Sequence, residues 1–206
     1  DHIPVQTVLM PATAKFVRVD LVKKGENVGY IMGAGDDIPA SLEQIGYKVS
    51  ILENKDLTAE NLANFDAVIL GIRAYNTIPD LKYHQAKLME YIKNGGTVIV
   101  QYNTSSRLVL DDLAPYPLKL SRDRVAVEEA KVRILAPKHE VMNTPNKITA
   151  NDFEDWVQER GLYFPNEWDE AFTPILSAND PGETPKDGGL LVAEYGEGYY
   201  IYSGYS

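Results

Sequence analysis

Hydrophobic positions between residues 27 and 103 follow two alternating periods. Four apolar runs have the length and composition of buried strands, at residues 28–32, 48–52, 67–71 and 97–101. Between them, apolar side chains recur at the spacing of one helix face, as at Ile38, Leu42 and Ile45. A later stretch repeats this spacing with Leu81, Leu88 and Ile92. The pattern predicts strands that alternate with helices.

Start and stop signals support these helices. Pro39 suits a first helical turn and Gly46 the position just past the end, while Gly95 and Gly96 close the later helix. Thr58 can cap a short helix at residues 60–63. Alternation of this kind requires parallel strands joined by right-handed crossovers. The predicted fold class is α/β, with an open, doubly wound, mostly parallel sheet.

The pattern is looser beyond residue 103. Residues 125–135 are predicted to be extended, residues 152–158 helical, and residues 180–189 a loop rich in Pro and Gly. Residues 190–195 and 199–202 flank a glycine turn, which predicts a hairpin that extends one sheet edge with antiparallel strands.

Tyrosines crowd this predicted hairpin. Alternation along the second strand puts Tyr200 and Tyr202 on one face and Tyr199 on the other. Aromatic side chains on both faces favour a covered sheet edge over a carbohydrate platform.

The first residues have a different character. Val17, Val19 and Leu21 alternate with Arg18 and Asp20, which predicts a half-buried strand after a linker that contains Pro. We therefore expect residues 1–27 to form a linker and arm from a preceding domain and residues 28–206 to form the α/β domain. The chain opens with Asp1 rather than Met, and both of its ends are expected to continue into a longer protein.

Composition narrows the function classes. The 206 residues carry a formal net charge of −10, which repels phosphate backbones and argues against nucleic acid as a partner. No apolar run approaches the ~20 residues that cross a bilayer, so no membrane partner is expected. The absence of cysteine excludes disulfides, thiolate metal sites and cysteine nucleophiles. Three histidines far apart suggest no metal site, and no cofactor is predicted.

Polar and aromatic residues follow three of the predicted strands. Because open α/β sheets bind ligands at the carboxyl ends of their strands, these residues should share one crevice. They are Gly35, Asp36 and Asp37, then Arg73, Tyr75 and Asn76, then Tyr102, Asn103 and Thr104. Such a set can hold a sugar by stacking and hydrogen bonds, with Arg73 available for a carboxylate or phosphate. The alternative is that Arg73 pairs with Asp36 or Asp37 and joins the loops.

The strand at residues 97–101 ends without a nucleophile. An amidotransferase or hydrolase of this layout would carry Cys or Ser there on a glycine-flanked turn, whereas Tyr102 and Asn103 occupy the place. A triad of Ser105 or Ser106, His139 and either Glu140 or Asp152 can be drawn, but neither serine has flanking glycines. His139 is nevertheless kept as a ligand-binding candidate. The Gly33–Gly35 segment lacks the third glycine of a dinucleotide fingerprint, so its glycines are predicted to serve a tight turn.

Four blocks of sequence carry a resemblance to known proteins: YIMGAGD at residues 30–36, GIRAYN at 71–76, NTPNKI at 143–148 and WVQERGLYF at 156–164. On these residues the chain resembles the class I glutamine amidotransferase-like superfamily, in the branch with ThuA-like proteins and the middle domain of some β-galactosidases. Within that branch it looks most like the C-terminal domain of large LmbE-related, PIG-L-type deacetylases.

The resemblance implies a fold of the glutamine amidotransferase-like, flavodoxin-like type and a zinc-dependent amino-sugar deacetylase domain earlier in the same parent chain. The metal motif of that domain, a His, Pro, Asp, Asp cluster, is not in this sequence. Two positions depart from the family: Tyr102 or Asn103 stands in place of the nucleophilic Cys, and Glu140 follows His139 where ThuA-like proteins usually have Pro. The resemblance also favours an exported or periplasmic location.

The leading hypothesis is a non-catalytic accessory domain of such a deacetylase, with a docking or carbohydrate-positioning role. The alternative is an independent hydrolase or isomerase that acts on a sugar derivative through His139 and a carboxylate, with Tyr102 as a further candidate acid or base. A flavodoxin-like binder of a phosphorylated cofactor rests on fold analogy alone.

Overall fold

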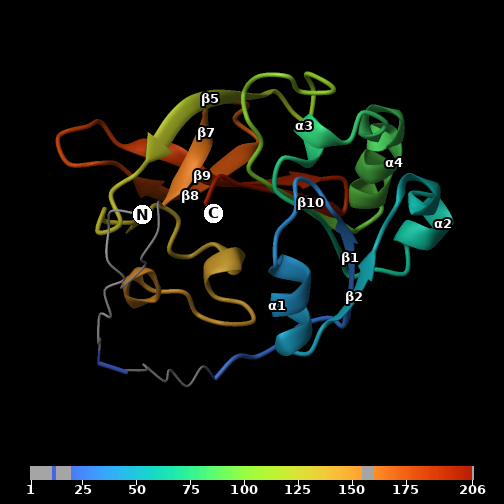
Figure 1. The fold of residues 1–206 in the computed structure, drawn as a ribbon, viewed down its shortest axis with the longest axis horizontal. Helices are drawn as coiled ribbons and strands as arrows, with labels where there is room; N and C mark the ends of the chain where they lie inside the picture. The colour runs from blue at the N-terminus through green and yellow to red at the C-terminus, as the bar shows by residue number, and fades with distance from the viewer. Residues whose placement is uncertain (1–10, 13–19, 155–159, 206) are drawn as a thin grey trace, which may run out of the picture.

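An eight-stranded sheet organises the chain, with strand order β2-β1-β3-β4-β10-β9-β8-β6 (Figure 1). The computed structural model describes residues 11–12, 20–154 and 160–205. The parallel part contains β1 (Asn27–Ile31), β2 (Lys48–Ile51), β3 (Ala67–Leu70) and β4 (Thr97–Gln101). The remaining strands of this sheet are β6 (Arg133–Ile134), β8 (Phe172–Ala178), β9 (Lys186–Tyr195) and β10 (Gly198–Ser203). A second sheet pairs β5 (Leu118–Val125) with β7 (Gly161–Trp168).

The fold class predicted from the sequence is confirmed. β1 pairs in parallel with β2 and β3, and β3 pairs in parallel with β4. The connecting helices are α1 (Ile38–Gln44), α2 (Ala59–Leu62) and α4 (Leu81–Lys93), joined by the short α3 (Ala74–Thr77) that the sequence pattern did not predict. Thr58 caps α2 by accepting a hydrogen bond from the Asn61 backbone N–H. Gly46 and Gly95 follow α1 and α4 with φ of +93° and +101°, as expected of residues that end helices.

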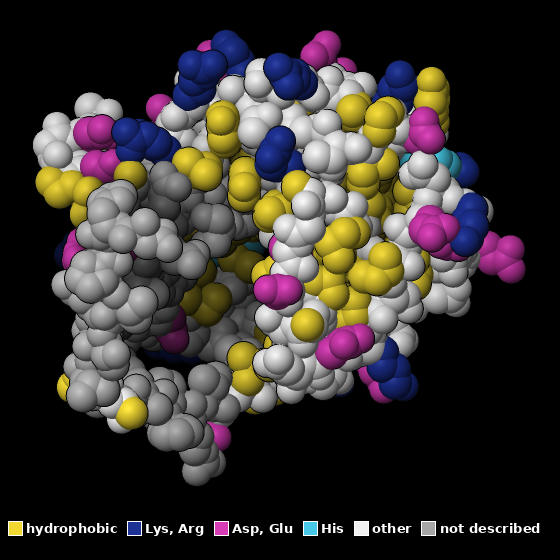
Figure 2. Space-filling view, viewed as in Figure 1, with side chains coloured by type: hydrophobic (Ala, Val, Ile, Leu, Met, Phe, Trp, Pro, Cys, Tyr) yellow, Lys and Arg dark blue, Asp and Glu magenta, His cyan; other side chains and the backbone are white. Residues whose placement is uncertain are grey.

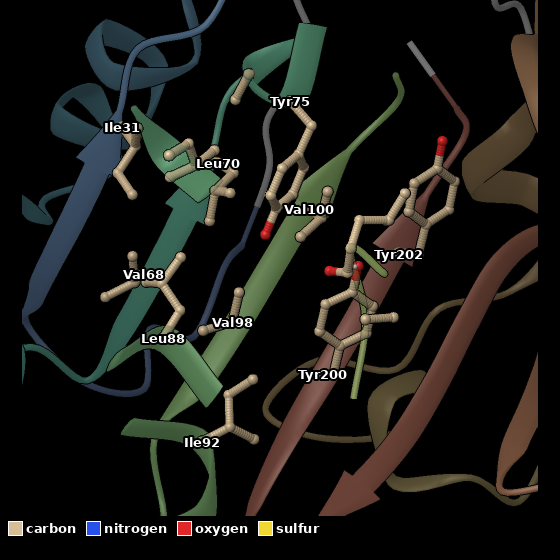
Figure 3. Packing of buried hydrophobic residues seen from close by; sticks show 14 of the residues in the cluster. Ile31, Val68, Leu70, Tyr75, Leu88, Ile92, Val98, Val100, Tyr200 and Tyr202 are labelled. Atoms are coloured by element: carbon tan, nitrogen blue, oxygen red, sulfur yellow. Dashed lines mark hydrogen bonds between the residues drawn. The ribbon is translucent and has the colours of Figure 1, made fainter. Parts of the chain in front are cut away.

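The largest core cluster lies on the face that α2 and α4 cover. Figure 3 shows Leu88 and Ile92 of α4 beside Val68 of β3 and Val98 of β4, and all four side chains are fully buried. Side chains four residues apart on α4 thus pack on side chains that point to the same face of two neighbouring strands. This is the packing that the helical and strand periods predict.

The C-terminal hairpin is confirmed, and it links the two parts of the sheet. β10 pairs in parallel with β4 on one side and antiparallel with β9 on the other. β8 and then β6 extend the sheet beyond β9. Tyr200 and Tyr202 are fully buried in the largest cluster, whereas Tyr199 on the opposite face is 36% exposed.

Several expectations for the second half of the chain are wrong. Residues 126–132 belong to no strand, because β5 ends at Val125 and the next strand, β6, begins at Arg133. The loop expected at 180–189 ends earlier, since Lys186 already pairs with Ala178 of β8. Of the helix expected at 152–158, Asp152 and Phe153 lie in a 3-10 helix, η3 (Ala150–Phe153), whereas residues 155–159 lie outside the described chain and leave that part of the expectation untested. The pattern also missed β5, β7 and β8.

The arm predicted at residues 1–27 falls largely on residues that the structure does not describe, among them Val17 and Val19. Leu21 is described, belongs to no strand and is 45% exposed. Val22 binds Asn146 through both its backbone N–H and its carbonyl, at 2.8 and 2.9 Å. This anchors the described part of the arm beside the segment that contains η2 (Glu140–Met142).

The opposite face of the sheet has much less helical cover. α1 lies on this face, none of its residues is buried, and Ile38 and Ile45 are 38% and 47% exposed. Figure 2 shows apolar side chains at the surface on this side of the molecule. No helix of the described residues is long and apolar enough to cross a membrane.

Burial in the main cluster predicts the cost of shortening its side chains. Leu88→Ala should lower the free energy of unfolding by about 2–5 kcal/mol, because it removes buried methyl groups and leaves a cavity. Ile45→Ala, at the exposed residue that directly follows α1, is the control and should cost less than about 1 kcal/mol. Urea unfolding measures both, and equal losses would contradict the assignment of the core to the α4 face.

Candidate functional site

Asp36 holds together the loops that follow β1 and β3. Its carboxylate accepts hydrogen bonds from the Tyr30 hydroxyl at 2.7 and 2.8 Å and from the backbone N–H groups of Ile38 and Ile72 at 3.1 and 3.3 Å. The Tyr30 hydroxyl in turn accepts from Gln101 at 2.8 Å. Burial and then the bond to Asp36 raise the pKa of Tyr30 well above its ordinary value, so it stays a neutral donor. This carboxylate is committed to the protein's own groups.

Asn103 is equally committed. It is fully buried, its Oδ1 accepts from the Tyr75 backbone N–H at 2.9 Å, and its Nδ2 donates to the Gln101 carbonyl at 2.9 Å. Its backbone N–H donates to the Tyr202 hydroxyl at 3.2 Å. A residue with these partners closes the end of β4 rather than presenting a group to a ligand.

Asn76 joins α3 to the loop after β4. Its Oδ1 accepts from the Thr104 backbone N–H at 2.9 Å, and its Nδ2 donates to the carbonyls of Thr104 and Ser106 at 3.2 and 3.0 Å. Tyr75, one residue earlier, is fully buried and donates its hydroxyl to Gln85 at 2.7 Å. Neither side chain is placed to stack on a sugar in the crevice.

Arg73 is the exposed cation of this crevice. Its backbone is left-handed, with φ of 58°, and its N–H donates to the Tyr102 carbonyl at 2.8 Å. Within the described chain no ion pair connects it to Asp36 or Asp37, so the alternative in which such a pair joins the loops is wrong. The joining group is Asp36 itself, through the Ile72 backbone N–H.

A non-glycine residue with a left-handed backbone closely follows β3, whereas none closely follows β4. Described non-glycine residues with left-handed φ are Arg73, Arg107 and Tyr163, and residues 101–104 are not among them. The end of β4 thus has neither a nucleophilic side chain nor the strained backbone that presents one.

Gly33 serves close packing between two loops. A Cβ atom on it would lie 2.1 Å from the Ile72 carbonyl oxygen, and the neighbouring Ala34 N–H donates to that same oxygen at 2.8 Å. Gly35 adopts φ of +104°, which side chains disfavour. These contacts agree with the predicted tight turn.

Nine of the ten candidate residues follow the three strands β1, β3 and β4, namely Gly35, Asp36, Asp37, Arg73, Tyr75, Asn76, Tyr102, Asn103 and Thr104. His139 does not join them. It lines a groove on the α1 face of the sheet, and none of the other nine residues lines that groove. The sequence had grouped His139 with the crevice because nothing in the pattern of residues 125–160 fixed where that segment would lie.

The groove has a volume of about 630 Å³. Its floor is aliphatic and comes from five strands: Val28 of β1, Ile69 of β3, Ile99 of β4, Ile201 of β10 and Val192 of β9. Leu42 and Tyr47 line it on the α1 side, and Val141, Thr144 and Pro145 line it from the segment that contains η2. The sheet floor is therefore covered on two flanks and open between them.

Polar side chains line the groove at the amino ends of the parallel strands. Lys24 lies 4.0 Å from Glu140, and both side chains are mostly exposed. Asp66 accepts from the backbone N–H groups of Glu26 and Asn27 at 2.7 and 2.9 Å. These two bonds lower the pKa of the Asp66 carboxyl below its ordinary value.

His139 caps η2 through its own ring. Its Nδ1 accepts from the Val141 backbone N–H at 3.2 Å, so in the neutral ring the proton lies on Nε2. Asp152 accepts from the Thr149 backbone N–H and hydroxyl at 2.6 and 2.9 Å. No hydrogen bond between described residues joins Ser105 or Ser106 to His139, so the triad drawn from the sequence does not form.

No protein-family model and no curated protein matches this chain, but solved structures do. A putative ThuA-like protein from Bacteroides uniformis has a TM-score of 0.54 and 13% identity over 91% of this chain and 84% of that one. A putative GMP synthase protein from Thermoplasma acidophilum has a TM-score of 0.52 and 11% identity over 89% and 85%. A β-galactosidase from Rahnella has a TM-score of 0.54 and 12% identity over 89% of this chain and 29% of its own.

These likenesses show the fold. The chain has the glutamine amidotransferase-like, ThuA-like fold that four sequence blocks had indicated. At identities of 11–13% they carry no activity across. Among the described residues, no three His, Asp or Glu side chains gather as metal ligands would.

Sequence reasoning missed the groove, although one signal pointed to it. Residues 199–202 carry large apolar or aromatic side chains on both faces of their strand, and so does the run at 97–101, with Ile99 between Val98 and Val100. Both faces of the central strands therefore need cover. The predicted helices are too few to cover both faces of a sheet of eight strands.

Truncating the buried amide at the end of β4 should be costly. Asn103→Ala leaves the Tyr75 N–H and the Gln101 carbonyl without this partner in a buried position, so the free energy of unfolding should fall by about 1–3 kcal/mol. Tyr102→Phe, one residue earlier and partly exposed, should change it by less than about 0.5 kcal/mol. Urea unfolding compares the two, and a neutral Asn103→Ala would show that the amide is not a structural anchor.

Asp66 predicts part of the acid sensitivity. Its pKa is lowered in the folded state, so it stabilises the fold above its unfolded pKa, and this contribution is lost as the pH falls through the folded pKa. Asp66→Asn should therefore lose less stability than the wild type between about pH 5 and pH 3. Thermal melts of Asp66→Asn and of the wild type across this range measure the slope, and equal slopes would contradict this role of Asp66.

Proposed function

We propose that this chain is a non-catalytic, amidotransferase-like accessory domain of an LmbE-related, PIG-L-type amino-sugar deacetylase. Its role is to dock onto the deacetylase domain of the same parent chain or to position carbohydrate for it. The observation that carries the non-catalytic part is the end of β4, where fully buried Asn103 binds three groups of the protein itself.

The hydrogen bonds of the crevice support the same proposal. Asp36 and Asn76 are each committed to at least two backbone groups of neighbouring loops, so neither is free to move a proton in a reaction. A general acid or base has to lie within hydrogen-bond reach of a substrate atom. The charged side chains that remain exposed in the crevice are Arg73 and Asp37, and Arg73 binds anions without exchanging its proton.

The accessory role rests on two further observations. The four sequence blocks resemble the C-terminal domain of large deacetylases, and the β-galactosidase from Rahnella contains this fold over only 29% of its chain. The fold is therefore compatible with a place inside a larger carbohydrate-active protein. The zinc chemistry and the substrate would belong to the domain that precedes this one.

An independent hydrolase or isomerase is the competing function. In the version that adds Tyr102 as acid or base, His139 and Tyr102 have to act on one substrate, yet His139 lines the groove on the α1 face and Tyr102 does not. This separation favours the accessory role.

The test uses the natural full-length chain, whose sequence before Asp1 should contain the His, Pro, Asp, Asp metal motif. Deacetylation of a monomeric N-acetyl amino sugar and of its oligosaccharides is compared with and without residues 28–206. We expect kcat on the monomer to change less than twofold and KM for oligosaccharides to rise on deletion. The isolated domain should show no turnover of either substrate.

Two outcomes would overturn the proposal. One is a metal motif missing from the natural chain. The other is hydrolysis by the isolated domain that Tyr102→Phe abolishes, which would favour the independent enzyme. Asp37→Asn is the matched control for that assay, since this exposed side chain has no role in the competing mechanism.

A further inference from the structure

The groove on the α1 face has the size of a small-molecule site. Its volume of about 630 Å³ lies within the ~300–1,000 Å³ of pockets that take drug-sized ligands. A stable protein partner would need roughly 800 Å² of contact on each side, far more than a groove confined between α1 and η2 provides. These dimensions favour a small ligand over a protein segment.

The floor of the groove favours a ligand with an apolar body. Ile69, Ile99 and Ile201 come from three neighbouring strands of the order β3-β4-β10 and all line the same face. Aliphatic side chains of this kind offer dispersion contacts and no hydrogen bonds, so an alkyl chain or alicyclic ring fits them better than a sugar ring. Tyr199, at 36% exposure, adds one aromatic ring at the same groove.

The charges at the rim of the groove favour a ligand with an uncharged head group. Lys24 faces Glu140 at 4.0 Å, and Asp66 adds a second carboxylate, so the groove has two acids for one ammonium. The whole chain carries a net charge of −10. A carboxylate or phosphate head would meet repulsion from both sources. Asp66 already accepts two backbone N–H groups, so its charge does not require a cationic ligand.

Donors and acceptors are nevertheless both present at this rim. His139 uses Nδ1 to accept from the Val141 N–H, which leaves Nε2–H as the donor of the neutral ring. Carboxylate oxygens of Asp66 and Glu140 are acceptors, and Thr97 and Thr144 bring hydroxyl groups that serve as either. A head group with several hydroxyls complements such a set.

We propose that the groove between α1 and η2 binds a neutral amphipathic small molecule. Its alkyl or alicyclic body lies over Ile69, Ile99 and Ile201, and its hydroxyl-bearing head lies beside His139 and Asp66. This site is separate from the crevice at the strand carboxyl ends. It requires no deacetylase domain, so its failure would leave the proposed function standing.

The probe is n-octyl β-glucoside, titrated into the protein by calorimetry below its micelle concentration. We expect saturable binding of one molecule per chain. Shortening the alkyl chain from eight to six carbons should weaken binding about tenfold, because each buried methylene contributes about 0.8 kcal/mol. Glucose alone should not bind measurably, and sodium octanoate should bind at least tenfold more weakly than the glucoside.

Two matched variants locate the site. Ile201→Thr keeps a β-branched residue in β10 and puts a hydroxyl on the groove floor, so it should weaken octyl glucoside binding about tenfold. Ile51→Thr is the control: Ile51 pairs with Tyr30 in the β1–β2 register, lies outside the groove and is 51% exposed. Its affinity should stay within twofold of the wild type. Urea midpoints establish that each variant is folded.

A third variant tests the head group. His139→Phe fills a similar space without the Nε2–H donor and should weaken octyl glucoside binding several-fold while leaving the dependence on alkyl length unchanged. The proposal is overturned if neither octyl nor decyl glucoside binds, or if Ile201→Thr and Ile51→Thr bind equally well. Octanoate binding as tight as that of the glucoside would overturn the neutral head group. If Ile201→Thr does not fold, Leu42→Ser on α1 replaces it with the same expectation.

Discussion

The parallel ladder between β4 and β10 is the contact on which the rest of the structure depends. It aligns residues 97–101 with residues 199–203, about half the chain apart, from Thr97 beside Tyr199 to Gln101 beside Ser203. Without it, the parallel strands and the antiparallel group of β10, β9, β8 and β6 would be two sheets with unpaired edges. The two fully buried tyrosines of β10 then attach the ladder to its surroundings: the Tyr202 hydroxyl accepts from the Asn103 N–H, and the Tyr200 hydroxyl donates to the Leu113 carbonyl.

This ladder also bears on the proposal that the end of β4 is not catalytic. In a sheet of this kind the carboxyl end of a central strand is the natural place for chemistry. Here the buried Asn103 has one partner in the segment after β3, one in the last residue of β4 and one in β10, namely Tyr75, Gln101 and Tyr202. Freeing that position for a reacting group would leave buried polar groups unpaired, at the general cost of such groups. A side chain at this position cannot both make these structural hydrogen bonds and take part in a reaction.

The sequence was informative where its periods were regular. Strand runs such as residues 97–101 and caps such as Thr58 depend on local geometry, and both were predicted correctly. It failed where strand identity depends on distant partners. β5 and β7 are far apart in the chain and pair with irregular register, and Pro165 interrupts the second of them, so their patterns do not alternate cleanly. His139 was misplaced for the same reason, because its position follows from the 137–149 segment reaching the α1 face. The groove exists through the shortage of helices on one face, which no single segment reveals.

The helix that lines this groove is weakly held. α1 has seven residues, none of them buried, and helices of that length are marginal on their own in water. Local opening of α1 therefore requires far less free energy than unfolding of the sheet, whose largest core cluster lies on the opposite face. Amide hydrogens of α1 will exchange through this local opening while those of β3 and β4 wait for global unfolding. The floor of the groove therefore belongs to the stable sheet, whereas α1 beside it opens more easily. The width of the groove depends on the equilibrium between the closed and locally opened states of α1.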